Sequence, residues 1–158
     1  MRTSIVRRPD GVATFGDLFA ALPFSNMLVV MEYTGAQLQQ ALEEQWQAND
    51  TRFMPLQVSE GLRYEWDKRR PVGQRVVPGS LTLNGQPIRP DQRVRVVINS
   101  FLQAGGDGFV TLAKGRLIQV GLNDVQALEA YFKSHGNTPV TPTALNRTVR
   151  VDEGDNDD

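Results

Sequence analysis

The sequence contains no cysteine and only one histidine, His135, among its 158 residues. Without cysteine the chain cannot form a disulfide bond, use a thiolate nucleophile or bind a metal through sulfur. With one histidine it also lacks the His-rich pattern of most hydrolytic metal centres. The composition therefore excludes cysteine-based chemistry, and any hydrolytic metal centre in this chain would have to be almost wholly carboxylate. It leaves the cellular compartment open.

Long hydrophobic runs and a strong net charge are also absent. No apolar segment approaches the roughly 20 residues of a membrane span, and the N-terminus lacks the pattern of a signal peptide, so we expect neither an anchor nor a targeting segment. The formal net charge is −1, and without the five acids of the last seven residues it becomes +4, from 17 basic and 13 acidic residues. This balance argues against a nucleic-acid binder. Fourteen of the basic residues are arginine, so the mildly basic body suits a small anion.

Capping residues and hydrophobic periodicity divide the chain into helices and strands. Capping boxes predict helices at residues 14–22, 34–48 and 123–133. Apolar runs predict strands at residues 26–33, 56–59, 62–66, 80–83, 86–88 and 94–99, and Asn84-Gly85 predicts a tight hairpin turn. After Gly136 we expect irregular structure. The elements do not alternate regularly, so the sequence predicts an α+β fold, in which helices flank a mixed or antiparallel sheet. We expect one domain, residues 1–150, and a disordered acidic tail, residues 151–158.

The segment SFLQAGGDGF at residues 100–109 follows the buried-strand pattern VRVVIN. An ordinary turn needs one glycine or an Asn-Gly pair, whereas this segment has three glycines around Asp107 and an aromatic residue towards each end. Glycine allows a backbone to lie close to another group. The segment is therefore interpreted as a backbone held close to another group. Its simpler interpretation is a turn before a helix with Asp107 as the N-cap, and the two can hold together.

Several segments in series resemble the C-terminal domain of the 5'-nucleotidase family, which includes UDP-sugar hydrolases and 2',3'-cyclic-nucleotide phosphodiesterases. They are LPF at residues 22–24, TGAQL at 34–38, LQVSEGLRY at 56–64 and FLQAGGDGF at 101–109. The resemblance runs from about residue 2 to about residue 149. It implies that an N-terminal metallophosphoesterase domain with two divalent metal ions and a His-Asp pair performs catalysis, while the C-terminal domain binds the nucleotide. This chain then corresponds to the second part alone, an excised fragment of a periplasmic or extracellular enzyme.

The resemblance also assigns ligand contacts to individual residues. Phe24 and Phe101 match the aromatic residues that sandwich the base, and stacking of this kind tolerates any base. Asp107 matches the aspartate that accepts hydrogen bonds from the ribose hydroxyls. Gly105 and Gly106 are expected to keep Cβ atoms out of the pocket. Arg2 matches an arginine that contacts phosphate or carboxylate groups, although the asparagine and glycines that precede it in the family are missing here.

These residues also have simpler interpretations. Composition alone favours core packing for both phenylalanines, and only the motif context reverses that preference. Arg2 is equally well interpreted as a frayed terminus. Ser100 stands where the family often has asparagine, so hydrogen bonding in the loop is expected to differ. Trp46 and Trp66 are interpreted as packing residues, and His135 as a partner of a helix C-terminus.

Two functions of different classes remain open. The phenylalanines and Asp107 favour the nucleotide-recognition domain of a metal-dependent nucleotidase, which hydrolyses phosphomonoesters or cyclic phosphodiesters. The alternative is a noncatalytic interaction module that keeps the fold without binding nucleotides. A stand-alone enzyme that uses Asp17 and Asp107 fits poorly, because no base or nucleophile accompanies them. The expected partners are a nucleotide or nucleoside and the metallophosphoesterase domain, with no nucleic acid, no catalytic residue and no cofactor in this chain.

Overall fold

The computed structural model describes residues 14–46, 52–136, 138–140 and 144–152. Its helices are α1 (Phe15–Ala21), α2 (Gly35–Glu43), α3 (Ser100–Gln103) and α4 (Asp124–Ser134), with short 3-10 turns η1 (Gly106–Gly108) and η2 (Leu112–Lys114). Its strands are β1 (Met27–Thr34), β2 (Leu62–Trp66), β3 (Thr82–Leu83), β4 (Gln86–Pro87), β5 (Arg93–Asn99), β6 (Arg116–Asn123) and β7 (Thr148–Arg150).

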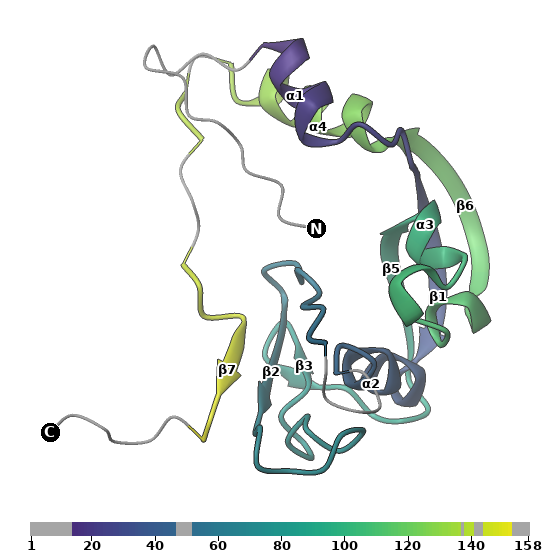
Figure 1. Cartoon of the computed structure of the whole chain (residues 1–158), viewed down its shortest axis with the longest axis vertical. Coiled ribbons are helices and arrows are strands. Elements are labelled where there is room, and N and C mark those ends of the chain that lie inside the picture. The colour runs from purple at the N-terminus through teal and green to yellow at the C-terminus, as the bar shows by residue number, and fades with distance from the viewer. Residues whose placement is uncertain (1–13, 47–51, 137, 141–143, 153–158) are drawn as a thin grey trace, which may run out of the picture.

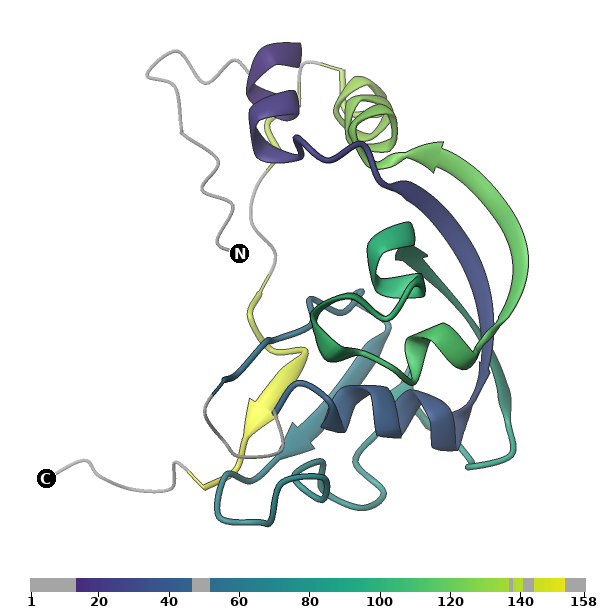
Figure 2. The same cartoon turned by 45° about the vertical axis from the view of Figure 1, so that its right-hand side comes forward.

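The strands form two sheets, and the predicted α+β class is confirmed. The first sheet is antiparallel, in the order β5-β1-β6, and the second has the order β4-β3-β2-β7 with β7 parallel to β2. Helices α1 and α4 lie together at one end of the long, curved strands β1 and β6, and α2 lies near the other end (Figure 1). The second view shows β7 beside β2, at the same end of the molecule as α2 (Figure 2).

Local sequence explains where the three longer helices begin. Thr14, Thr34 and Asn123 each accept a hydrogen bond from the backbone N–H three residues later, and the side chain at that position binds back to the cap. These reciprocal bonds satisfy backbone donors that the first turn leaves open. The predicted capping boxes are therefore confirmed, as is the hairpin turn at Asn84-Gly85, where both residues have positive φ values, of 50° and 78°.

Two apolar clusters hold the sheets together, and α2 contributes to both. Leu38 and Leu42 face the second sheet, in a cluster with Trp46, Tyr64, Val76, Leu81 and Val94. Ala41 faces the first sheet, in a cluster with Val29, Met31, Tyr33, Phe109 and Leu112. Because one helix serves both clusters, the position of α2 couples the two sheets.

Several predicted boundaries and elements are wrong. Helix α2 ends at Glu43 rather than near residue 48. The predicted strand at residues 56–59 does not form. Instead the backbone N–H of Leu56 donates to the buried side chain of Gln45 at 2.8 Å, so a side chain replaces a strand partner. Strand β6 was not predicted, because it lies at a sheet edge, where most of its side chains are exposed and no alternation marks it.

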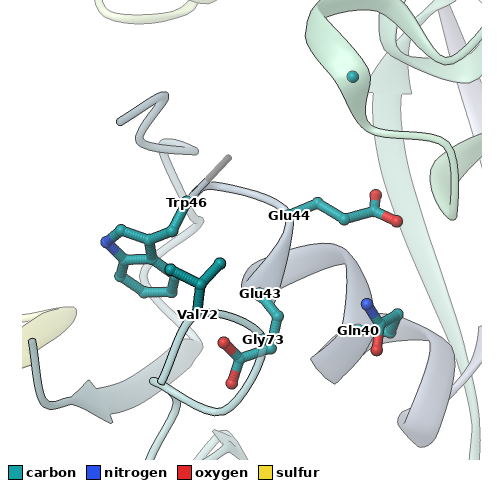
Figure 3. A pocket seen from close by; sticks show the side chains of 7 residues that line it. Gln40, Glu43, Glu44, Trp46, Val72 and Gly73 are labelled. Carbon is teal, nitrogen blue, oxygen red and sulfur yellow. The ribbon is translucent and has the colours of Figure 1, made fainter. Parts of the chain in front are cut away.

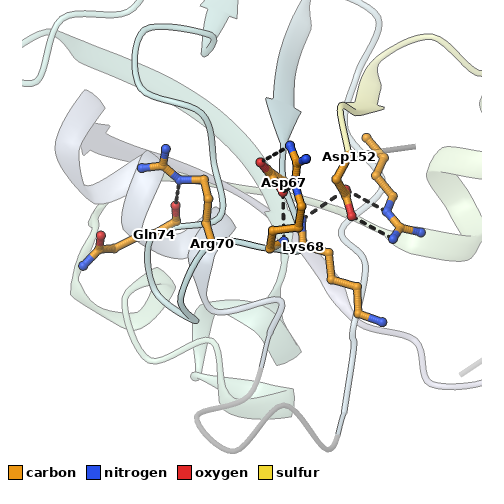
Figure 4. A network of polar contacts seen from close by, with 7 residues as sticks. Asp67, Lys68, Arg70, Gln74 and Asp152 are labelled. Atoms are coloured by element: carbon orange, nitrogen blue, oxygen red, sulfur yellow. Dashed lines mark hydrogen bonds and ion pairs between the residues drawn. The ribbon is translucent and has the colours of Figure 1, made fainter. Parts of the chain in front are cut away.

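Strand β7 is a further correction, because the sequence predicted irregular structure after Gly136. The residue that anchors β7 is Asp152, which accepts hydrogen bonds from the Arg150 guanidinium and from the backbone N–H of Lys68 (Figure 4). These bonds hold the pKa of the Asp152 carboxyl well below the ordinary range. The guanidinium of Arg150 also lies 5.4 Å from the Trp66 ring centroid. Asp152 belongs to the predicted acidic tail, and the rest of that tail, residues 153–158, lies outside the described residues.

Glu32 ties the central strand β1 to both neighbouring strands. Its carboxylate accepts hydrogen bonds from Arg93 of β5 at 2.8 Å and from Arg116 of β6 at 2.9 Å, and its side chain is only 9% exposed. The two arginines hold the pKa of the carboxyl below its ordinary value of 4.5. A carboxyl with a lowered folded-state pKa stabilises the fold above the unfolded-state pKa, and that contribution is lost as the pH falls through the folded-state pKa.

Glu32→Gln should therefore lower the urea midpoint of unfolding at about pH 7 and have a smaller effect at about pH 3. Asp91→Asn is the control, because Asp91 also pairs with an arginine but is 82% exposed. Equal losses at both pH values for Glu32→Gln would contradict the charge-based explanation.

Trp46 predicts a second stability effect. The residue is 4% exposed, and its ring lies 5.6 Å from the Phe53 ring and 5.2 Å from the Trp66 ring, centroid to centroid. Trp46→Ala should reduce the free energy of unfolding by about 3 to 5 kcal/mol, because it leaves a cavity in this cluster. Phe53→Ala, which removes a ring that is 48% exposed, should cost clearly less in the same denaturation experiment. Similar losses for the two variants would contradict this ranking.

Candidate functional site

The paired ends of β1 and β5 bring the two predicted aromatic segments to one place. The strands are antiparallel and Leu28 pairs with Asn99, so the start of β1 lies beside the end of β5. Phe24 comes three residues before β1, and Phe101 comes two residues after β5. Phe24 and Phe101 therefore lie just beyond the strands, at the end of the sheet where β1 begins and β5 ends.

Ser100 joins these two segments. The backbone N–H of Met27 donates to Ser100 Oγ at 3.1 Å, and the same oxygen lies 3.4 Å from Asn26 Oδ1. The residue that departs from the usual family pattern thus serves as a link between the segments of Phe24 and Phe101. Asn99, one position earlier, accepts a hydrogen bond from the backbone N–H of Leu102 at 2.8 Å and so caps α3.

The aromatic residues of the site differ sharply in exposure. Phe24 is 56% exposed and Phe101 is 47% exposed, whereas Phe109, the second aromatic residue of the loop, is 2% exposed. Phe109 packs with Met31 and Tyr33 in the cluster against the first sheet. One aromatic residue therefore anchors the loop in the core, and Phe101 and Phe24 keep ring surface accessible.

The loop between the two aromatic residues has a left-handed backbone at three positions. Gly105, Asp107 and Gly108 have φ values of 82°, 56° and 86°. Glycine adopts this region without steric cost, and aspartate tolerates it better than most residues. Gly105 occupies the N-cap position of η1, so Asp107 is not the cap that its simpler interpretation predicted.

Gly106 allows the ring of Phe101 to lie against the loop backbone. A Cβ atom at Gly106 would lie 2.5 Å from two carbons of that ring, which is too close for any side chain. The ring therefore rests against the backbone on one side, while Phe101 as a residue remains 47% exposed. Gly106 thus sets the position of Phe101.

Two polar contacts brace the loop beyond Phe109. Thr111 donates to the Glu44 carboxylate through its backbone N–H, at 3.1 Å, and through its hydroxyl. The Tyr33 hydroxyl donates to the carbonyl of Leu112 at 2.7 Å, and burial raises the pKa of Tyr33 to about 12. The loop is thereby fastened to α2 and to β1, the elements that also carry the core.

The carboxylate of Asp107 lies at the surface of this loop. Its side chain is 35% exposed, and its Oδ1 atom lies 3.7 Å from Nη2 of Arg52. Arg52 was not among the residues predicted from the sequence, because it is distant along the chain and belongs to no recognised motif. Arg2, the predicted phosphate contact, lies outside the described residues.

An open cavity of about 400 Å³ lies beside the C-terminal part of α2, and neither Phe24 nor Phe101 is among the residues that line it (Figure 3). Its lining residues are Gln40, Glu43, Glu44, Trp46, Val72, Gly73 and Gly108. Glu43 is buried and accepts hydrogen bonds from the backbone N–H groups of Arg75 and Val76, at 2.8 and 2.7 Å, and burial raises its pKa. The carboxylates of Glu43 and Glu44 both line the cavity and already accept hydrogen bonds from other residues of the chain. They make the cavity unsuited to an anionic ligand.

The other residues that the sequence singled out have structural roles, as predicted. Trp46 is buried, and Trp66 packs partly buried against the same cluster. His135 is the C-cap of α4, and its Nδ1 atom lies 2.8 Å from the carbonyl oxygen of Tyr131. Within the described part of the chain, no three His, Cys, Asp or Glu side chains gather as metal ligands, and no helix is long and apolar enough to cross a membrane.

The fold and the loop define an α+β domain that presents exposed aromatic rings and an acidic residue at one end of an antiparallel sheet. Residues 1–114 match the family described as 5'-nucleotidase, C-terminal domain. The chain belongs to this family, and is thus a C-terminal domain of the kind found in 5'-nucleotidase-type hydrolases.

The chain is also similar to individual proteins and to a solved structure. A cell wall protein of Listeria monocytogenes is 38% identical over 76% of this chain and 15% of its own length. A 5'-nucleotidase-related protein of Glossina morsitans morsitans is 33% identical over 96% of this chain and 28% of its own length. The crystal structure of a 5'-nucleotidase precursor from Thermus thermophilus matches 90% of this chain and 28% of its own, with a TM-score of 0.72 and 34% identity. The chain therefore spans less than a third of each of these proteins.

The contact between Gly106 and Phe101 yields a prediction. Gly106→Ala should displace the Phe101 ring, because the backbone at Gly106 is not left-handed and the atoms nearest to the added carbon all belong to that ring. The displacement should change the NMR chemical shifts of the Phe101 ring protons. Gly16→Ala, where the nearest atom lies 3.8 Å from the added carbon, should leave them unchanged. Unchanged Phe101 shifts in Gly106→Ala would contradict the proposed packing.

Proposed function

We propose that this domain recognises the nucleotide for a metal-dependent nucleotidase. In this proposal the base lies between Phe24 and Phe101, and the ribose hydroxyls donate to Asp107. Gly105 keeps a Cβ atom away from the ligand, and Gly106 leaves room for the Phe101 ring on which the base stacks. Arg2 would contact a phosphate group, as the family resemblance implies. The parent protein would hydrolyse phosphomonoesters or cyclic phosphodiesters of nucleotides.

The observation that carries the proposal is the position of Phe101. The ring of Phe101 rests on Gly106, and the residue as a whole is 47% exposed. Phe101 stands six residues before Asp107 on a loop that the core holds in place. A half-exposed ring with one supported side offers a flat surface for a base, and the neighbouring carboxylate accepts hydrogen bonds from a diol. Phe24 is exposed at the same end of the β1–β5 pair and supplies the second ring of the sandwich.

The described residues do not fit a two-metal hydrolytic centre, because they provide no group of three ligands. We therefore assign the metal ions and the hydrolysis to an N-terminal metallophosphoesterase domain of the same parent protein. The expected location is periplasmic or extracellular, and a cell wall protein is among the relatives. The role of the present chain is to bind and orient the substrate.

Phe101→Ala tests the aromatic sandwich. Base stacking on an aromatic side chain contributes about 1 to 3 kcal/mol, so the variant should bind adenosine and AMP roughly five- to 150-fold more weakly. Isothermal titration calorimetry on the 158-residue chain measures this change. A phosphate-release assay with added Mn²⁺ or Zn²⁺ should show no hydrolysis of AMP by the wild-type chain.

Leu117→Ala is a matched control, because Leu117 is an apolar residue of similar exposure, 50%. It lies near the start of β6, whereas the end of β6 pairs with the start of β1, close to Phe24 in sequence. The variant should leave adenosine affinity unchanged. Equal affinities of wild type and Phe101→Ala would refute the sandwich, and metal-dependent phosphate release by this chain would refute the division of labour. A wild-type chain that binds no nucleoside would favour the noncatalytic interaction module.

A further inference from the structure

Arg52 and Asp107 form an ion pair across two loops that are far apart in the sequence. Arg52 Nη2 lies 3.7 Å from Asp107 Oδ1, and the side chains are 60% and 35% exposed. Asp107 follows Gly106, the residue that supports the Phe101 ring. Arg52 therefore touches the site from outside the sequence motif that marks it.

The backbone next to Arg52 is firmly held. The ring of Phe53 stacks on Trp46 with an interplanar angle of 14° and also lies 5.8 Å from Trp66, centroid to centroid. The backbone N–H of Met54 donates to the carbonyl of Gln45 at 2.8 Å. Because Phe53 and Met54 follow Arg52 directly in sequence, their contacts fix the backbone on the C-terminal side of Arg52. The guanidinium therefore reaches Asp107 from a backbone position that packing holds in place.

We propose that Arg52 is a positioning residue, which orients the Asp107 carboxylate for the hydroxyl groups of a ribose. This inference rests on the proposed nucleotide-binding function. The Asp107 side chain is 35% exposed, and a bound guanidinium restricts the rotamers that such a side chain can adopt. A carboxylate has about four acceptor positions, so it can accept hydrogen bonds from more than one donor at the same time.

The role makes Arg52 a determinant of specificity for the sugar rather than for the base. Its influence reaches the ligand through Asp107, so it should affect only ligands that carry the vicinal hydroxyl groups. A guanidinium that instead competed with the ribose for Asp107 would have the opposite effect, and its removal would strengthen binding. The sign of the change in affinity distinguishes these two roles.

Titration calorimetry with adenosine and 2',3'-dideoxyadenosine tests the proposal on the 158-residue chain. Exposed ion pairs contribute up to about 1 kcal/mol, so Arg52→Ala should weaken adenosine binding about two- to fivefold and leave dideoxyadenosine binding unchanged. Arg52→Lys should retain part of the preference for adenosine. Asp107→Asn should reduce the preference for adenosine over dideoxyadenosine at least as much as Arg52→Ala does. The double variant should show no further loss of that preference beyond Asp107→Asn alone.

Arg89→Ala is the matched control, because Arg89 forms an exposed pair with Asp91 at 3.5 Å in a different turn. It should not alter the preference for adenosine. If Arg52 has a purely structural role, Arg52→Ala should weaken the binding of adenosine and of dideoxyadenosine equally. That result would overturn the inference. An unchanged preference for adenosine over dideoxyadenosine, or tighter binding of adenosine, would overturn it as well. If Phe101→Ala abolishes binding while Arg52→Ala changes nothing, the inference fails and the proposed function stands. If the wild-type chain binds neither ligand, both fail.

Discussion

The register of β1 between β5 and β6 is the constraint on which the rest of the structure depends. It places Leu28 opposite Asn99 and Met27 opposite Asn123, so that α1, α3 and α4 all meet one end of the first sheet. A slip of one residue would turn every side chain of β1 to the other face, because side chains alternate along a strand. It would also separate Met27 from Ser100 and thereby the segment of Phe24 from that of Phe101.

Helix α2 transmits this arrangement to the loop. It contributes to both apolar clusters, and Glu44 directly after it accepts hydrogen bonds from Thr111. The glycine-rich loop is therefore held on its C-terminal side by buried Phe109 and by Glu44, and on its N-terminal side by the hydrogen bonds of Asn99 and Ser100. Under the proposed function, a loop fixed at both ends loses little conformational entropy when a ligand binds.

The three longer helices and the hairpin were predictable because their causes are local, whereas α3 lies in a segment for which no helix was predicted. A capping box or an Asn-Gly pair acts within four residues, so the pattern that causes the structure is visible in the sequence itself. The short strand β7 and the edge strand β6 were not predictable, since β7 exists only through its pairing with β2 and β6 carries no alternation of exposure. The second sheet as a separate unit was missed for the same reason.

The sequence by itself determined the α+β class, the capped helices and the motif residues Phe24, Phe101 and Asp107, because those features depend on neighbouring residues or on a recognisable order of segments. Only the tertiary structure decided that Phe101 is exposed while Phe109 is buried, since both are aromatic residues of one loop. It alone brought Arg52 to Asp107 and showed that Ser100 links the two aromatic segments. Contacts between residues so distant in sequence follow from how strands and loops pack, and no local pattern encodes them.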